Sequence, residues 1–400
     1  MGHLLSNLVA KTRRAVEDRN LRMLLLTNFF RIFSMSMINP ITPLFISSLG
    51  AETINVSLVL SASSAASIFL SVPSGLLADR YGRKKTIVIS IVLSIIPPIF
   101  FSLSTHWEQI IPWAILLSIS ATMYFPAKDS IIADYTTPEN RAMFYGAINM
   151  AFSAAYIIAP VTGGFIVDHY GWTYSFYFII LTAMLSLISA SNLSETTGEG
   201  IVCKEGKKIE AGKERYLLTL TFFITYYLLL GIAIAMVLMA IPLYLDNVLN
   251  MSKTQIGLFF SAGMGVAPLL TQIPSGKIVK KIGGRRALFS YILMITLPLI
   301  AWPTMKSPYA LLILMIAFGG AYAMTWVAES TLIMNIVPHA LRGLSSAVTV
   351  TALSVGRTIG PMVGGLIWNQ LGPETVFYLS ALFFSLSSIP IFLLKRAEHM

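Results

Sequence analysis

Apolar residues in this chain occur in long runs, without the short alternation of apolar and polar positions that marks half-buried strands. The stretches 87–104, 174–190 and 376–394 contain no charged residue. A helix of about 20 apolar residues crosses the hydrocarbon core of a bilayer. These runs therefore predict membrane-spanning helices.

The same pattern, read between successive clusters of charged residues, repeats along the whole chain. We predict an all-α membrane protein with twelve transmembrane helices. Their expected positions are 22–46, 55–76, 86–104, 110–134, 142–166, 172–192, 216–245, 254–275, 287–304, 309–335, 344–368 and 375–394.

The composition of the 400 residues agrees with a chain that faces lipid. Hydrophobic residues make up 56% and charged residues only 12%, whereas a soluble protein carries about a quarter charged residues. The mean hydropathy is +0.74. The single cysteine, Cys203, excludes a disulfide within the chain.

The formal net charge of +10 is distributed by side of the membrane. Of the 28 Lys and Arg residues, 23 fall on the side that holds both ends of the chain, and two, Lys253 and Lys306, fall on the other. Basic loops stay in the cytoplasm, so we expect both termini to be cytoplasmic. The positive charge is thus a topology signal, and no nucleic-acid partner is expected.

The two halves of the sequence resemble each other at an offset of about 200 residues. Segment 72–85 recurs at 273–286, and segment 159–164 recurs at 360–365. Both copies of the first segment lie on the basic side, so each half contains an even number of spans. We predict two six-helix bundles, 1–192 and 216–400, joined by a cytoplasmic linker, 193–215. Such parallel repeats, related by a pseudo-two-fold axis, hold substrate near the midplane and rock to give alternating access.

The loop after the second predicted helix carries a recognisable motif. The sequence Gly-Leu-Leu-Ala-Asp-Arg-Tyr-Gly-Arg-Lys-Lys at 75–85 resembles the signature loop between helices 2 and 3 of the major facilitator superfamily. Segment 126–142 resembles the helix 4–5 region of the same family. The resemblance covers essentially the whole chain and implies a transporter with a small-molecule substrate, without indicating which one.

The family resemblance also implies a gate in this loop. The residues concerned are Gly75, Asp79, Arg80, Gly82, Arg83 and Asp134. Glycine permits a tight turn and a close approach of the backbone. The resemblance implies that Asp79 and Arg83 form a charge network with Asp134, which closes the cytoplasmic side. A turn with solvated charges that only sets topology is the alternative.

Small residues and prolines mark helices that pack closely or bend. The residues expected in this role are Gly146, Pro160, Gly163, Gly164, Gly360 and Pro361. The first four resemble a glycine pattern that antiporters of the family often carry in helix 5, although alanine replaces two of its glycines. Ordinary tight packing explains them equally well. Segment 39–45 in helix 1 resembles the twelve-span drug/proton antiporters.

Four charged residues inside predicted spans are the candidates for the transport pathway: Arg31, Asp129, Glu329 and Arg357. A charge at the bilayer centre costs at least about 2.5–3.5 kcal/mol, so it normally faces the interior and pairs. We expect Arg31 to pair with Asp129, and Glu329 with Arg357. The carboxylates either carry coupling protons or form structural bridges between helices.

Other classes of function are disfavoured. All five histidines fall in predicted loops or tails, so no metal pair or Ser–His arrangement lies in a span, and an enzyme is not expected. No Gly-x4-Gly-Lys-Ser/Thr loop is present, so ATP is not expected to drive transport. No metal or other cofactor is predicted.

We therefore predict a multi-pass transporter of the plasma membrane that exports drugs or lipophilic compounds in exchange for protons, as a monomer in the lipid bilayer. The alternative is a proton- or anion-coupled carrier of a small organic anion, a carboxylate or phosphate ester, because arginine clamps such groups with two hydrogen bonds. Direction, coupling ion and substrate identity are left open by the sequence.

Overall fold

The computed structural model describes residues 19–136, 138–195, 213–337 and 342–399, and every regular element in these ranges is helical. The first half contains α2 (Arg19–Ser48), α3 (Thr53–Tyr81), α4 (Arg83–Leu103), α5 (Ile110–Tyr135), α6 (Pro138–Tyr170) and α7 (Trp172–Ser191). The short 3-10 helix η1 (Trp107–Gln109) precedes α5.

The second half follows the same plan. It contains α8 (Lys213–Asn247), α9 (Lys253–Phe260), η2 (Ser261–Val266), α10 (Ala267–Ile282), α11 (Gly284–Ala301), η3 (Trp302–Thr304), α12 (Pro308–Ile336), α13 (Arg342–Leu371) and α14 (Pro373–His399). The elements α9, η2 and α10 form one continuous span, with η2 a π-helical turn inside it. In the described part of the chain, twelve spans are long and apolar enough to cross a membrane, which confirms the predicted fold class.

Glycine makes the tightest connections between helices. Gly82 alone separates α3 from α4, with φ 101°, and Gly171 alone separates α6 from α7, with φ 89°. Gly283 and Gly372 occupy the equivalent places in the second half, with φ 84° and 92°. Glycine adopts these left-handed angles without the steric cost of a Cβ. The repeat seen in the sequence thus recurs in backbone geometry.

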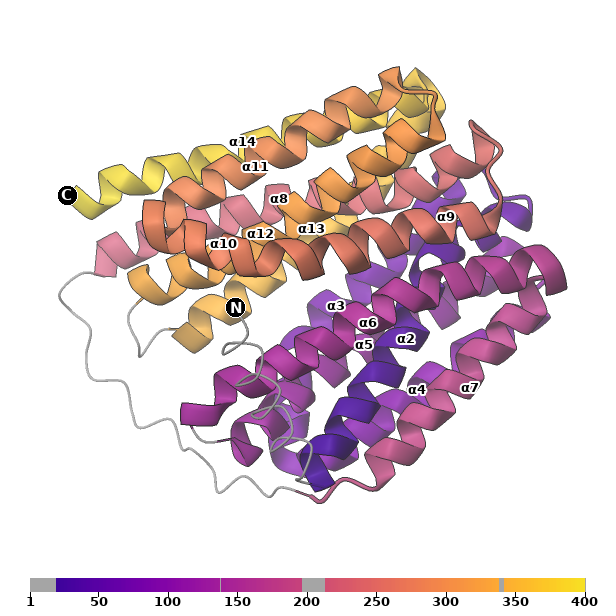
Figure 1. Ribbon diagram of the computed structural model, residues 1–400, viewed down its shortest axis with the longest axis horizontal. Coiled ribbons are helices and arrows are strands. Elements are labelled where there is room, and N and C mark those ends of the chain that lie inside the picture. Colours follow the sequence, from indigo (N-terminus) through magenta and orange to yellow (C-terminus); the bar gives the residue numbers. More distant parts are fainter. Residues whose placement is uncertain (1–18, 137, 196–212, 338–341, 400) are drawn as a thin grey trace, which may run out of the picture.

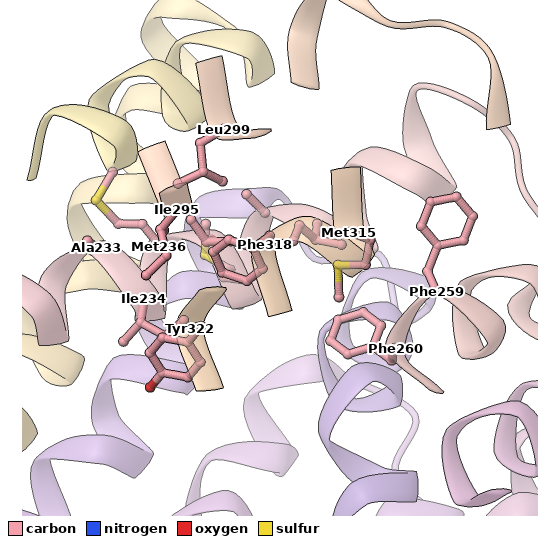
Figure 2. Packing of buried hydrophobic residues seen from close by; sticks show 14 of the residues in the cluster. Ala233, Ile234, Met236, Phe259, Phe260, Ile295, Leu299, Met315, Phe318 and Tyr322 are labelled. Atoms are coloured by element: carbon pink, nitrogen blue, oxygen red, sulfur yellow. The ribbon is translucent and has the colours of Figure 1, made fainter. Parts of the chain in front are cut away.

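The two halves lie side by side in Figure 1, with α2 to α7 in indigo to magenta and α8 to α14 in salmon to yellow. Within the second half, α8 packs against α13 and α14, and α11 packs against α12 and α14. Figure 2 shows the apolar side chains between these helices, among them Met236, Ile295 and Phe318. Large apolar side chains such as Phe69, Tyr309 and Phe392 are exposed on the outside, as expected for surfaces that face lipid.

The two halves meet closely on one side of the molecule, the side that holds the start of α3 and the start of α9. There α6 packs against α9 and η2, and α3 packs against α13. Gly164 of α6 lies against the backbone of Lys253, and Gly365 of α13 lies against the side chain of Ser57. Asn369 donates a hydrogen bond to Glu52 at 3.4 Å. The structure is therefore closed on this side.

Candidate functional site

A cavity of about 450 Å³ lies between the two halves. Helices α2, α3, α5 and α6 line it from the first half, and α8, α9, η2, α10, α12 and α13 line it from the second. Its aromatic side chains are Phe125, Phe152, Tyr156, Phe260, Tyr322 and Trp326. Met35, Met239 and Met264 add flexible apolar surface. A cavity of this size and character suits a drug-sized ligand.

Aromatic pairs form walls of the cavity in both halves. Phe152 stacks on Tyr156 of α6, with ring centroids 4.8 Å apart and an interplanar angle of 26°. On α12, Tyr322 meets Trp326 edge to face at 5.5 Å. Asn39 of α2 donates a hydrogen bond to the Tyr156 hydroxyl at 3.3 Å. Flat apolar surfaces with a few polar groups thus surround the cavity.

Arg357 is the only charged residue among the described ones that line the cavity. Its helix, α13, lies against α8, because glycines in both helices let the backbones approach closely. A Cβ at Gly231 would lie 3.1 Å from the backbone nitrogen of Arg357, and a Cβ at Gly356 would lie 2.8 Å from the backbone nitrogen of Ile232. The Arg357 side chain is exposed toward the cavity and lies within electrostatic range of Tyr156.

Glu329 lies on α12, about one turn beyond Trp326, and is 8% exposed. Two consecutive tyrosines of α8 donate to its carboxylate, Tyr226 at 2.6 Å and Tyr227 at 3.1 Å. The predicted ion pair between Glu329 and Arg357 is therefore wrong. The carboxylate faces α8, whereas the guanidinium faces the cavity. Two adjacent tyrosines in the middle of a largely apolar helix were the available signal for these partners.

Arg31 is fully buried in the first half. It donates to the Ser120 hydroxyl at 2.6 Å and lies 5.5 Å from the centre of the Tyr124 ring, within range of a cation–π interaction. Its Nε and one terminal nitrogen make no hydrogen bond with the described residues.

The predicted pairing of Arg31 with Asp129 is also wrong. Asp129 pairs instead with its neighbour Lys128 at 3.2 Å, and its side chain is 50% exposed. Ser120, the partner of Arg31, and Asp129 are nine residues apart on α5. At 3.6 residues per turn they lie on opposite faces of the helix, so only one of them reaches Arg31.

The loop between α3 and α4 brings Arg83 and Asp134 together in an ion pair. Arg83 also donates to the backbone carbonyl of Ser130 at 3.1 Å. Arg80 lies over the ring of its neighbour Tyr81, 5.7 Å from the centroid. The surroundings of Gly75 and Asp79 lie outside the described part of the structure, so the predicted role of Asp79 in this network stays a prediction.

The carboxylate of Glu195, just after α7, joins the same loop. It accepts the backbone N–H groups of Lys84 at 3.0 Å and Lys85 at 3.3 Å, at the start of α4. An acidic group at a helix N-terminus satisfies free N–H donors and interacts favourably with the helix dipole. A Cβ on Gly82 would lie 2.8 Å from the Glu195 carboxyl carbon, so glycine leaves room for this contact. Glu195 is not among the residues predicted for this loop, because it is distant along the chain.

Comparison with known families identifies this architecture. The family model described as Major Facilitator Superfamily matches residues 24–225 and again 223–399. The chain belongs to the major facilitator superfamily. The suspected resemblance is thereby confirmed, and the repeated match agrees with two similar halves.

Relatives within the superfamily are named as drug-resistance proteins. Multidrug resistance protein 2 of Bacillus subtilis (strain 168) is 24% identical over 369 residues, covering 88% of this chain and 90% of the relative. Quinolone resistance protein NorA of Staphylococcus aureus (strain MSSA476) is 23% identical over 379 residues, covering 93% and 95%.

Solved structures of the superfamily share the fold. A bacterial homologue of the human lysosomal transporter Spinster, in an inward-facing and occupied conformation, aligns with a TM-score of 0.74 at 16% identity, covering 94% of this chain and 96% of that one. The nucleoside transporter NupG aligns with a TM-score of 0.75 at 14% identity, covering 95% and 99%. The chain is thus a multi-pass membrane transporter of this superfamily, and these relatives are transporters rather than enzymes.

Two glycines of α6 allow close contact with neighbouring helices, Gly163 with α2 and Gly164 with α9. A Cβ on Gly163 would lie 2.7 Å from the side chains of Met37 and Ile41 on α2, and Gly164 faces α9. The carbonyl of Pro160, inside α6, lies against Gly257 of α9.

Two further packing residues lie on α13, and one prediction fails. A Cβ on Gly360 would lie 3.0 Å from the side chain of Ala235, and Pro361 lines the cavity. Gly146, by contrast, is exposed, and a Cβ there meets no atom within 4 Å. Its predicted packing role is therefore wrong, because it faces away from its neighbours.

Within the described ranges, no group of three or more His, Cys, Asp or Glu side chains is placed to hold a metal ion.

Proposed function

We propose that this superfamily member exports drug-like amphipathic compounds across the plasma membrane by alternating access, in exchange for protons. The observation that carries the proposal is the cavity between the two halves, with walls of aromatic and methionine side chains from both. Such surfaces accept ligands of varied shape. Relatives named as multidrug and quinolone resistance proteins support the choice of substrate.

The distribution of basic residues supports a cytoplasmic location for both termini. With that orientation, the side closed by α6 with α9 and by α3 with α13 faces outward. The structure then represents an inward-facing state, in which cytoplasmic compounds reach the cavity. Rocking of the halves would separate these outer contacts and release the compound outside.

Glu329 is the proposed proton carrier. It is the only carboxylate in the described residues that is buried in the protein, and it has no cation partner there. Both of its tyrosine partners belong to α8, which packs against the cavity helix α13. A change in its protonation would alter the hydrogen bonds between α12 and α8, and so alter how these helices pack. Asp129, half-exposed beside Lys128, is a weaker candidate.

One observation favours the second candidate, a carrier of small organic anions: the described residues that line the cavity include an arginine, Arg357, and no acidic residue. The two candidates differ in direction and in proton coupling, which transport measurements separate.

The test uses the full chain in proteoliposomes with an acidic interior and a radiolabelled quinolone outside. The proposal expects uptake driven by the proton gradient and lost in Glu329→Gln. The same variant should still exchange labelled for unlabelled quinolone without a gradient, because substrate binding is intact. Glu108→Gln, a surface variant in η1, serves as control and should transport normally. Gradient-driven uptake by Glu329→Gln would refute the proton role.

A further inference from the structure

The wall of the cavity carries one sign of charge. Among the described residues that line it, Arg357 is the only one with an ionised side chain, and the other polar groups are neutral: two amides, three serine hydroxyls, two phenols and an indole N–H. The Arg357 guanidinium forms no ion pair with the described residues. Its side chain is exposed to the cavity, so an anion that enters would find an opposite charge with donors that no carboxylate occupies.

Three carboxylates on described parts of the cavity helices, Asp129 of α5, Asp168 of α6 and Glu329 of α12, are engaged away from the cavity. Glu329 accepts two tyrosine hydroxyls on its own side of α12. Asp129 pairs with Lys128, and Asp168 accepts hydrogen bonds from the start of α9. None of the three lines the cavity. A lipophilic cation there would meet no counter-charge and would be repelled by Arg357.

A second cation lies behind the wall. Arg31 is buried on α2, directly before Ile32 and one turn before Met35, and both of these line the cavity. Its guanidinium contacts Ser120 and the Tyr124 ring and has no acidic partner among the described residues. Charges interact over longer distances in a low dielectric than in water, so Arg31 adds to the positive potential of the cavity.

The groups around Arg357 define the shape of a complementary ligand. Tyr156 lies within its electrostatic range and belongs to the stacked pair Phe152–Tyr156, while Trp326 and Tyr322 contribute from α12. A guanidinium binds a carboxylate or sulfonate through two parallel hydrogen bonds, and aromatic walls accept a flat apolar body.

From these observations we infer that the substrates are amphipathic organic anions, with the anionic group anchored on Arg357 and an aromatic body between the walls of α6 and α12. Lipophilic cations are excluded by charge. The inference rests on the proposed function only in taking this cavity as the transport site.

The test compares two probes that share one ring system, 2-naphthoate and 2-naphthylmethylammonium. Their Kd values are measured by calorimetry on the full chain in lipid nanodiscs, for wild type, Arg357→Gln, Arg357→Lys and the control Lys306→Gln. Lys306 is an exposed cation in the loop before α12, outside the cavity.

Wild type and the control should bind naphthoate at least about tenfold more tightly than the ammonium probe, as expected for a charge-assisted hydrogen bond. Arg357→Gln should bring the two Kd values within about threefold of each other. Arg357→Lys should retain part of the preference, because lysine keeps the charge but lacks the planar fork. A wild type that binds both probes equally, or prefers the ammonium, would overturn the inference.

If Arg357→Gln does not fold, as judged by gel filtration and thermal unfolding, the binding of both probes to Arg357→Lys tests the inference. Weaker naphthoate binding with unchanged ammonium binding supports the anchor, and unchanged naphthoate binding contradicts it. Quinolone exchange in proteoliposomes distinguishes the two proposals. Exchange without any charge preference leaves the proposed function and removes the inference. An Arg357-dependent preference for the anionic probe without quinolone exchange keeps the inference and removes the proposed function.

Discussion

The carboxylate of Asp168, near the end of α6, accepts the backbone N–H of Thr254 at 2.7 Å and the Thr254 hydroxyl at 2.6 Å. The backbone N–H of Lys253 donates to the same carboxylate at 3.0 Å. Thr254 is in the first turn of α9, so a residue of one half caps a helix of the other. Lys253 in turn pairs with Asp246 at the end of α8. The hydrogen bonds of Asp168 to the start of α9 stabilise the closed side of the structure.

Replacing Asp168 by alanine should shift the equilibrium toward a state open on this side. The loss of these hydrogen bonds to a charged acceptor corresponds to about 1.5–3 kcal/mol, or roughly a ten- to hundredfold change in the equilibrium. The measurement is labelling of Ser63→Cys, in the cavity wall, by a membrane-impermeant maleimide applied outside, in a Cys203→Ser background. Thr254→Val, which removes only the hydroxyl contact, should give a smaller increase. Labelling unchanged by Asp168→Ala would show that the contact does not hold this side closed.

Gly164 should tolerate no larger side chain. A Cβ there would overlap the backbone of Lys253, so Gly164→Val should prevent closure and abolish quinolone transport, while the protein still inserts in the membrane. Gly146 of the same helix offers a matched control, because a Cβ there meets nothing. Gly146→Ala should transport normally and raise stability by up to about 1 kcal/mol, since alanine favours helix over glycine. Normal transport by Gly164→Val would contradict the close approach of α6 and α9.

The two tyrosines should stabilise Glu329 unequally. The Tyr226 bond, at 2.6 Å, is the shorter and is buried, so Tyr226→Phe should reduce stability by about 1.5–3 kcal/mol and Tyr227→Phe by less. Thermal unfolding in detergent measures both. In a Glu329→Gln background the cost of Tyr226→Phe should shrink, because the acceptor is no longer charged. Equal costs in both backgrounds would mean that the tyrosine acts through packing alone.

The Arg83–Asp134 pair should be needed for gating rather than for topology. Arg83→Asp or Asp134→Arg alone places two like charges together, and we expect each to lower transport severalfold. The double exchange Arg83→Asp with Asp134→Arg should recover part of it. Protease accessibility of the termini checks that orientation is unchanged. Inverted orientation in the single variants would instead support a role in topology.

The twelve spans were predictable because the bilayer demands long apolar runs, and α4, for example, begins at the Gly82 turn and ends just before the polar turn that contains His106 and Glu108. Side-chain partners across helices were not. Sequence gives the depth of a residue along its helix, but the neighbouring helix can satisfy it with an uncharged group. Ser120 thus took the place expected for Asp129, and Tyr226 the place expected for Arg357.

The glycines of α6 show the same limit. Gly146 and Gly164 belong to one sequence pattern, yet only Gly164 faces a neighbouring helix. Which face of a helix meets a partner depends on how the bundles assemble, and a single sequence does not contain that rotation.

Proton exchange through Glu329 is tested most sharply by proton movement that substrate drives. Proteoliposomes of the full chain, with a pH-sensitive dye inside and no initial pH gradient, are given an outward gradient of a quinolone. We expect acidification of the interior as the quinolone leaves, for wild type and Glu108→Gln but not for Glu329→Gln. Quinolone efflux with no change in interior pH, or equal acidification by Glu329→Gln, would contradict proton exchange through Glu329.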